Sequence, residues 1–371
     1  MSETNSRSNE SLNYTKAGVN TLKEGAALDN ILKWVKPTLA FRQNKFGAAK
    51  LDIGFFANVI EIGDNLGLAL STDGVGTKIL IAQMMKKFDT VGIDCVAMNV
   101  NDIICVGAEP TSMLDYLAIQ SVEHESFLED IAKGLYEGAK IANVAISGGE
   151  MAQTKDIIKG VHDGYGFDLV GMGLGRVALD KVVIGQNINE GDVVIGLRSS
   201  GVHSNGLTLA RKLFFDKMNL STNHQFAELD KSIGEELLVP THIYVPEIME
   251  ILNAGVDVKA LINITSDGFL NLTRVKSDVG YILENLPPLQ PIFDLIQHHG
   301  NITDEEMFKV YNMGIGFCIV AAEHSVEKIQ SILQKHNVEN HRLGYAVADS
   351  ERKVIVKSRS LIGKGKHFHK S

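Results

Sequence analysis

Residues 67–78 read GLALSTDGVGTK, an apolar run followed by a loop with unusual chemistry. The run GLALS is typical of a strand that leads into the loop. The loop combines a carboxylate, two glycines, a hydroxyl and an ammonium group. A P-loop would require G-x-x-x-x-G-K-[ST], with the lysine before the hydroxyl residue. Here Thr77 precedes Lys78, and one residue separates Gly74 from Gly76, so the loop is of another kind.

The composition indicates a soluble globular protein. The 371 residues suffice for two domains that each bury a core, and 44% hydrophobic with 22% charged residues is ordinary. No apolar run approaches the ~20 residues of a membrane span, and the polar N-terminus lacks a signal-peptide core. The net charge of -9 argues against a nucleic-acid surface. Three cysteines without C-x-x-C spacing indicate buried thiols in a reducing, cytoplasmic compartment: Cys95, Cys105 and Cys318.

Apolar runs alternate with helical patterns along the chain, which predicts two α/β domains that meet near residue 180. We expect disorder at 1–13, a first domain at 14–180, a second at 181–357 and a loose basic tail at 358–371. The patterns predict strands over 67–71, 144–150, 168–177, 192–197 and 313–322. They predict helices over 90–108, 126–142, 203–217 and 325–336.

Acidic residues stand at or near the ends of predicted elements in the first domain: Asp73, Asp94, Asp102 and Glu150. Clustered carboxylates repel each other unless a cation joins them, so this group fits a Mg2+ site. Local capping or pairing explains Asp94 and Asp102 equally well. Gly148 and Gly149 precede Glu150 and allow the backbone to approach a ligand closely.

A second loop, RSSGVHSNGL at 198–207, follows the strand DVVIGL and opens a helix. It is rich in glycine and in short hydrogen-bonding residues: Ser199, Ser200, Gly201, Ser204, Asn205 and Gly206. Free N–H groups at a helix N-terminus form an anion site suited to phosphate. His203 can donate to a phosphate or act as an acid or base. Ordinary N-capping beside an exposed histidine is the alternative interpretation.

Other patterns have simpler explanations. GMGLGR at 171–176 lacks the Rossmann spacing and lies inside a predicted strand, so we assign its glycines to packing. The pair His298 and His299 has no ligand partner at metal spacing and reads as the exposed end of a helix. No G-x-S-x-G elbow supports a serine hydrolase.

Taken together, the motifs resemble the phosphoribosylformylglycinamidine cyclo-ligase family, the aminoimidazole ribonucleotide synthetases. Between Tyr14 and residue 347 they are, in order, YTKAGV, FGAA, STDGVGTK, GIDCVAMNVNDIICVGAEPTSMLDY, ISGGE, SSGVHSNG, LLVPTHIYV and FKVYNMGIGF. The resemblance implies an N-terminal α/β domain whose sheet pairs across a homodimer into a barrel. It also implies a C-terminal α/β domain beside the first.

The resemblance further implies the reaction of formylglycinamidine ribonucleotide with ATP and Mg2+ to give aminoimidazole ribonucleotide, ADP and phosphate. ATP would phosphorylate the formamide oxygen, which is otherwise a very poor leaving group. Asp73 would hold Mg2+, with Asp94, Asp102 and Glu150 on the nucleotide side. Lys78 would neutralise the transferred phosphoryl group, and His203 is the acid or base candidate. ATP and phosphate would contact Thr72, Gly74, Gly76, Thr77, Asn101, Gly148, Gly149, Ser199, Ser200, Gly201, Ser204, Asn205 and Gly206.

Four residues depart from the family pattern. Asn263 stands where bacterial-type members have the histidine of H-x-T-G-G-G, and Ser266 and Asp267 replace two of its glycines. His242 stands where arginine is common, which exchanges a fixed charge for a titratable one.

Sister enzymes of the same ATP-using superfamily are the first alternative: thiamine-monophosphate kinase, selenophosphate synthetase and the synthetase one step earlier in purine synthesis. The sequence lacks the signatures expected of these enzymes. Selenophosphate synthetase, for example, would need a reactive cysteine near the N-terminus, but the first cysteine is Cys95, in a predicted apolar helix. A nucleotide-binding protein without catalysis is the other alternative. The retained acidic residues, Lys78 and His203 argue against it.

Overall fold

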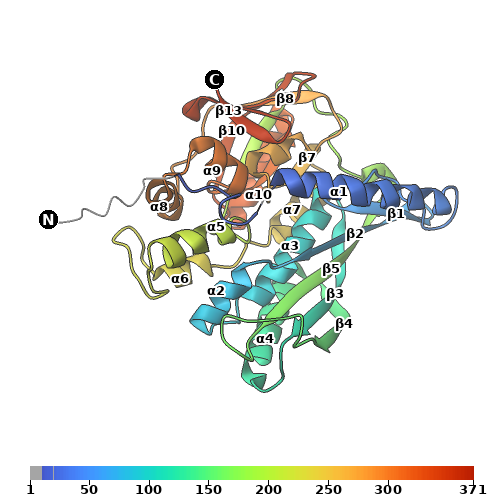
Figure 1. The fold of residues 1–371 in the computed structure, drawn as a ribbon. Helices are drawn as coiled ribbons and strands as arrows, with labels where there is room; N and C mark the ends of the chain where they lie inside the picture. The colour runs from blue at the N-terminus through green and yellow to red at the C-terminus, as the bar shows by residue number, and fades with distance from the viewer. Residues whose placement is uncertain (1–10, 20) are drawn as a thin grey trace.

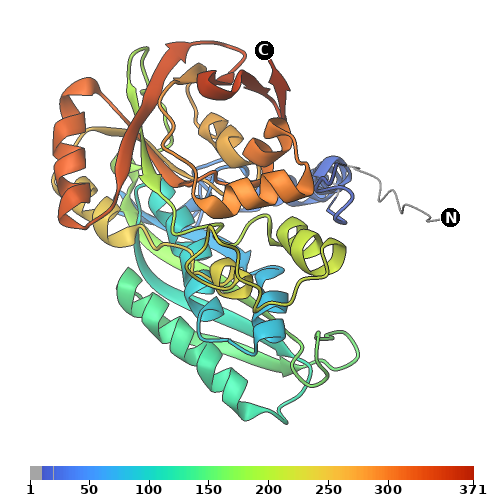
Figure 2. The same ribbon diagram turned by 90° about the vertical axis from the view of Figure 1, so that its left-hand side faces the viewer.

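The structure is a computed structural model that describes residues 11–19 and 21–371. Its strands form two sheets, one in each half of the chain, and helices pack against both (Figures 1 and 2). The α/β class predicted from the sequence is therefore confirmed. Most of the segment expected to be disordered, residues 1–13, lies outside the described residues. In the described part of the chain, no helix has the length and apolar character that crossing a membrane requires.

The first sheet has five strands in the order β1-β2-β5-β3-β4. They are β1 (Asn58–Gly63), β2 (Leu66–Gly74), β3 (Glu109–Ile119), β4 (Ala145–Gln153) and β5 (Phe167–Ala178). β3 and β4 are parallel, and the other neighbours are antiparallel. α1 (Thr21–Val35) and the 3-10 helix η1 (Lys36–Arg42) precede the sheet, and α2 (Lys78–Met85) follows β2. α3 (Val91–Cys105) and α4 (Glu125–Ala142) lie within two residues of the predicted helix starts.

Glycines on β5 allow α3 to pack directly on the sheet. A Cβ atom at Gly175 would lie 2.4 Å from Cγ2 of Ile103, and one at Gly171 would lie 2.6 Å from Nδ2 of Asn99. Because side chains alternate along a strand, these glycines share the face toward α3. The packing role assigned to GMGLGR agrees with this geometry. Larger residues at these positions would force the helix away from the sheet.

The second sheet has eight strands in the order β13-β12-β11-β8-β10-β6-β9-β7. They are β6 (Val193–Arg198), β7 (Val258–Asn263), β8 (Val279–Leu283), β9 (Ile315–Ala321), β10 (Asn340–Ala348), β11 (Val354–Val356), β12 (Leu361–Lys364) and β13 (His367–Lys370). The helices of this half are α5 (Leu207–Arg211), α6 (Ile233–Leu237), α7 (Val245–Asn253), α8 (Pro291–Gly300), α9 (Asp304–Val310) and α10 (Glu323–Lys335). Short 3-10 helices are η2 (Leu179–Lys181), η4 (Gly268–Thr273) and η5 (Lys357–Arg359), and Lys212–Lys217 form a π-helical turn.

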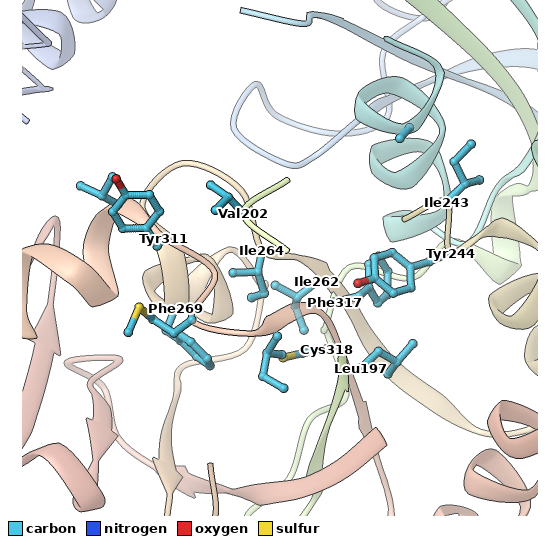
Figure 3. Packing of buried hydrophobic residues seen from close by; sticks show 14 of the residues in the cluster. Leu197, Val202, Ile243, Tyr244, Ile262, Ile264, Phe269, Tyr311, Phe317 and Cys318 are labelled. Carbon is cyan, nitrogen blue, oxygen red and sulfur yellow. The ribbon is translucent and has the colours of Figure 1, made fainter. Parts of the chain in front are cut away.

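β9 runs through the centre of the second core. All seven of its residues are buried, as expected for a strand covered on both faces. Figure 3 shows Phe317 and Cys318 of this strand beside Ile262 of β7 and Leu197 of β6. Cys318 and the other two cysteines are buried free thiols, as the sequence indicated.

Two segments differ from the sequence analysis. The helix expected from residue 203 begins at Leu207, because residues 199–206 form a loop held by side-chain contacts. The tail expected to be loose forms the hairpin of β12 and β13. Phe368 is buried against Phe308, and Lys370 pairs with Asp304 at 2.6 Å. The basic composition of the tail hid this alternation of inward and outward side chains.

Candidate active site

Helix α3 lies between the first sheet and elements β7 and α7 of the second half (Figure 1). Polar side chains along it are buried or half-buried: Asp94, Asn99, Asn101 and Asp102. A buried polar group is costly unless it is hydrogen-bonded. Each of the four has a partner, and three of them have partners in the second half of the chain. The helix is therefore the structural centre of the candidate site.

Asp94 forms a fully buried ion pair with Lys78. Nζ of Lys78 lies 2.9 Å from Oδ1 of Asp94, and both side chains are 0% exposed. The same oxygen accepts from the backbone N–H of Thr241 at 2.8 Å and from its hydroxyl at 2.7 Å. Lys78 also donates to the carbonyl oxygen of Val239 at 2.6 Å. Asp94 thus pairs with other protein groups through Oδ1, one of the two alternatives open from the sequence, while its Oδ2 is buried without a hydrogen-bond partner among the described residues.

Burial also shifts the pKa of Lys78. It lowers the pKa of the Lys78 ammonium, and the nearby Asp94 carboxylate offsets part of that effect. The ammonium is enclosed by α2, α3 and the segment that contains Val239. The partners of the Lys78 ammonium here are thus protein groups, and its contact with a transferred phosphoryl group stays a prediction.

Asn101 and Asp102 contact other parts of the second half. Nδ2 of Asn101 donates to the carbonyl oxygen of His242 at 2.8 Å, and its Oδ1 accepts from the N–H of Tyr244 at 3.0 Å. Oδ1 of Asp102 accepts from Nδ2 of Asn263 at 2.8 Å. Both ends of the Asn101 amide thus hold the loop before α7, and its predicted contact with ATP or phosphate is not tested by this geometry. The departure at Asn263 places a hydrogen-bond donor beside Asp102.

Asp73 lies at the end of β2, next to α3. Its backbone N–H donates to Oδ1 of Asn99 at 3.1 Å, and Nδ2 of Asn99 donates back to its carbonyl oxygen at 3.2 Å. Asp73 is opposite Gly171 on β5, and Gly171 is opposite Asp115 on β3. The three residues form one row across the sheet, so Asp73 and Asp115 point toward the same face. Sequence analysis missed Asp115, although a carboxylate within the apolar stretch MLDYLAI is unusual.

These carboxylates carry the electrostatic signature of a cation site. Burial raises the pKa of Asp73 and of Asp115. Burial raises the pKa of Asp102 to about 7, and the nearby Asp73 carboxylate adds to the rise. Removing carboxylates from water without a full counter-charge is unfavourable, and a divalent cation would relieve that cost. Among the described residues, neither Asp73 nor Asp102 forms an ion pair within 4.0 Å. The more distant charge of Arg274 offsets part of the rise in the pKa of Asp102.

Glu150 lies apart from this group. It is opposite Tyr116 in the pairing of β4 with β3, one position beyond the pair of Gly149 and Asp115. Its side chain therefore points to the other face of the sheet from Asp115. Over the described residues, no group of three or more His, Cys, Asp or Glu side chains is arranged to hold a metal. The four acids expected to act together thus separate into Asp73 with Asp102, the paired Asp94 and the distant Glu150.

The loop at 199–206 is held by side chains from two other segments. Nδ2 of Asn312 donates to the carbonyl oxygens of Gly201 and Val202 at 2.9 and 3.2 Å. Gly206 adopts φ +79°, and a Cβ atom there would lie 2.2 Å from Cε1 of Tyr311. Ser204 donates to Oδ1 of Asp94 at 3.1 Å, which ties the loop to α3. Asn312 was not singled out from the sequence, although it belongs to the FKVYN motif.

His203 is inside this loop and is 3% exposed. Its Nε2 accepts from the backbone N–H of Ser200 at 3.2 Å. Burial lowers the pKa of His203 well below its usual value, and the charge of Lys78 contributes. A neutral, enclosed imidazole that accepts from the backbone holds the turn in shape. The burial contradicts the exposed histidine considered in the sequence analysis, and the acid or base role of His203 stays a prediction.

Arg274, which the sequence analysis also missed, clamps the loop before β1. Its guanidinium donates to the carbonyl oxygens of Gly54 at 3.2 Å and Phe55 at 3.0 Å. It also lies 4.0 Å from the ring centroid of Phe56. His242 pairs with Glu247 of α7 at 2.8 Å, so the residue that stands in place of arginine joins the loop before α7 to the first turn of that helix.

The buried ion pair leads to a stability prediction. Lys78→Met or Asp94→Asn alone leaves one side uncompensated, so each should lower the free energy of unfolding by about 3–5 kcal/mol. The double variant should lose clearly less than the sum, because it removes both charges. Urea unfolding measures these values. Lys133→Met, in an exposed pair with Glu129, is the matched control and should change stability by about 1 kcal/mol or less. Additive single losses would contradict direct coupling.

Comparison with protein families agrees with this architecture. The family model described as AIR synthase related protein, N-terminal domain, matches residues 56–177. The model described as AIR synthase related protein, C-terminal domain, matches residues 189–357. The hairpin of β12 and β13 lies beyond both matches.

Curated proteins match over nearly the whole chain. A phosphoribosylformylglycinamidine cyclo-ligase of Methanocaldococcus jannaschii is 44% identical over 352 residues, 95% of each chain. One of Pyrococcus horikoshii is 46% identical over 347 residues, covering 94% of this chain and 98% of the relative.

Solved structures share the fold at lower identity. AaThiL complexed with AMPPCP and TMP has a TM-score of 0.62 at 14% identity and covers 93% of this chain and 96% of its own. T. maritima PurL complexed with ADP has a TM-score of 0.54 at 15% identity and covers 83% of this chain and 44% of its own. At these identities the likeness concerns the fold alone. The family models and the curated relatives show that the chain belongs to the AIR synthase family, as its motifs indicated.

Proposed function

We propose that this chain is an ATP-dependent cyclo-ligase that converts formylglycinamidine ribonucleotide to aminoimidazole ribonucleotide in purine biosynthesis in the cytoplasm. The observation that carries the proposal is identity of 44–46% to enzymes of that name across at least nine-tenths of both chains in the two relatives described. AaThiL, the structural neighbour complexed with AMPPCP and TMP, is only 14% identical, so it gives no comparable support for a kinase.

For this reaction the protein mainly has to position the substrates and neutralise their negative charge. A formamide carbonyl is a poor electrophile, and its oxygen is a poor leaving group. ATP supplies the phosphoryl group that turns this oxygen into a leaving group. The chain must hold the two substrates in line, keep water away and neutralise negative charge. Lys78 and His203 serve these ends as positioning residues, since both are buried within the packing that joins the two halves.

Asp73 and Asp102 are the residues that would hold Mg2+. Both carboxyl groups have pKa values raised by burial, and Asp73 contributes to the rise at Asp102. Mg2+ commonly takes one or two carboxylates and completes its shell with water and phosphate oxygens. The separation of Glu150 from this pair is compatible with such a site. Asp115, on the same face of the sheet as Asp73, is a further candidate.

Phosphate groups would be bound by backbone and hydroxyl groups at the two loops. In the first loop, Gly76 has φ +70° and is exposed, and Thr72 is exposed beside Asp73. Gly148 and Gly149 are exposed on β4. In the second loop, Ser200 is exposed, and Ser204 and Asn205 are half-buried. The other predicted contacts in these loops remain proposals on the same basis: Gly74, Thr77, Ser199, Gly201 and Gly206.

A homodimer would cover the open face of the first sheet. α3 and α4 pack on one face only, and apolar side chains point from the other. They are Leu68, Leu70, Leu114, Tyr116, Val170, Met172 and Leu174. Leu114 is 39% exposed and Tyr116 43% exposed. An apolar sheet face of this extent is typical of an interface, and a second copy of the sheet would bury it.

Turnover is the direct test of the proposed reaction. With Mg·ATP, formylglycinamidine ribonucleotide should stimulate ADP release, and the aromatic amine of the product should appear in equal amount. A coupled ADP assay and a colour assay for the amine measure the two products in one sample. ADP release with thiamine monophosphate, and none with the ribonucleotide, would contradict the proposal and favour a sister enzyme.

The metal assignment makes a separate prediction. Asp73→Asn removes a charge that the cation requires, so turnover should fall at least about 100-fold while the thermal unfolding midpoint stays near that of the wild type. Asp180→Asn is the matched control, because Asp180 lies on the same domain but contacts Asn65 at its surface. Titration with Mg2+ measures the effect. Full activity of the variant with unchanged Mg2+ dependence would rule out Asp73 as a ligand.

A further inference from the structure

Two features left unexplained by the sequence analysis meet at one pocket. They are the basic C-terminal tail and Asp267, which the sequence analysis noted as a departure from the motif of bacterial-type members. The pocket has a volume of about 290 Å³ and is lined by Tyr14, Glu24, Asp267, Lys309, Lys366 and His367, among others. Its walls come from the N-terminal segment, α1, the loop before η4, the end of α9 and the hairpin of β12 and β13.

The hairpin holds its tip firmly against this pocket. Lys364 of β12 pairs with His367 of β13, so Gly365 and Lys366 form a two-residue turn. Gly365 has φ +60°, the conformation that such a turn requires at its first position. Phe368 is 5% exposed and anchors β13 beside Phe308. Lys366 is therefore presented by a fixed turn rather than by a free tail.

The pocket adjoins the loop that the proposed function assigns to phosphate. Burial raises the pKa of the Tyr14 hydroxyl, and the nearby backbone N–H of Gly206 offsets part of this rise. The hydroxyl of Tyr311 donates to the carbonyl oxygen of the same Gly206 at 3.1 Å. The wall residue Tyr14 thus lies near the glycine that ends the SSGVHSNG loop. A ligand in the pocket would lie beside the candidate active site.

The side chains in the pocket offer both cationic donors and carboxylate acceptors. Among the described residues, Lys366 has no carboxylate within 4.0 Å and no hydrogen bond. Its Nζ lies 3.0 Å from where a Cβ would stand at Gly25, so this glycine leaves the ammonium room beside α1. Asp267 holds φ +72°, an unfavourable conformation for a residue with a side chain. A lysine without an ion pair, in a pocket that is also lined by carboxylates, suits a ligand with an anionic end and hydroxyl groups.

We infer that this pocket binds the ribose 5-phosphate end of the ribonucleotide substrate. Lys366, with His367, binds the phosphate, and Asp267 accepts hydrogen bonds from ribose hydroxyls. Carboxylates commonly recognise ribose hydroxyls in this way, and a lysine binds phosphate as a point charge. The volume suits a sugar phosphate better than a complete nucleoside triphosphate. The inference rests on the proposed function for the identity of the substrate.

Kinetics of Lys366→Gln test the site. The KM for formylglycinamidine ribonucleotide should rise about tenfold, because one charged contact to phosphate is lost, while kcat and the KM for ATP stay within twofold. Lys366→Arg should recover most of the loss. Lys364→Gln is the matched control, since Lys364 lies on the same hairpin but pairs with Glu351 outside the pocket. Unchanged KM values in Lys366→Gln would overturn the inference, and a rise for ATP alone would overturn the ribonucleotide assignment.

Binding of ribose 5-phosphate, followed by calorimetry, separates this inference from the proposed function. The wild-type chain should bind the sugar phosphate, and Lys366→Gln and Asp267→Asn should each weaken binding several-fold. If the wild type binds the probe in this way but does not turn over the ribonucleotide, the proposed reaction fails and the pocket stands. If turnover is normal but both variants bind like the wild type, the pocket assignment fails alone.

Discussion

The structure depends on the buried polar side chains of α3. Asp94, Asn99 and Asn101 are 0% exposed, and burying such groups is unfavourable unless each hydrogen bond is made. Their partners come from β2, α2 and the loop before α7, so the bonds can form only when the two halves of the chain hold one arrangement. A shift of α3 would leave several of these groups without partners at once. This constraint fixes one arrangement of the two halves of the chain, which apolar packing alone would not specify.

The candidate site is built around that helix. Asn99 holds the backbone of Asp73, and Asp102 lies one turn further along α3. The carboxylates proposed to hold Mg2+ are thus placed by the element that also fixes the second half. Ser204 on the phosphate loop reaches Asp94 of the same helix. The buried pair of Lys78 and Asp94 therefore supports catalysis through position, because changes to it would displace both loops.

The sequence predicted much of this organisation and missed parts that depend on distant contacts. Periodicity located α3, α4, β2 and β5, because their burial patterns are local. Spacing left the role of Asp94 open, since its partners Lys78 and Thr241 are 16 and 147 residues away in the sequence. Motifs gave Lys78 and His203 roles at the substrate but did not indicate that both side chains are buried. The tail was misread because its basic residues obscured Leu361 and Phe368, whose burial depends on the second sheet.

The rate of hydrogen exchange at two backbone amides tests the central role of α3 most directly. The N–H of Thr241 donates to Asp94 at 2.8 Å, and that of Tyr244 donates to Asn101 at 3.0 Å. Both lie in a loop that would exchange quickly if α3 did not hold it. Native-state hydrogen exchange should show both amides protected to the level of the β9 core, with Asn101→Ala releasing Tyr244 first. Rapid exchange of both amides in the wild-type chain would contradict the central role of α3.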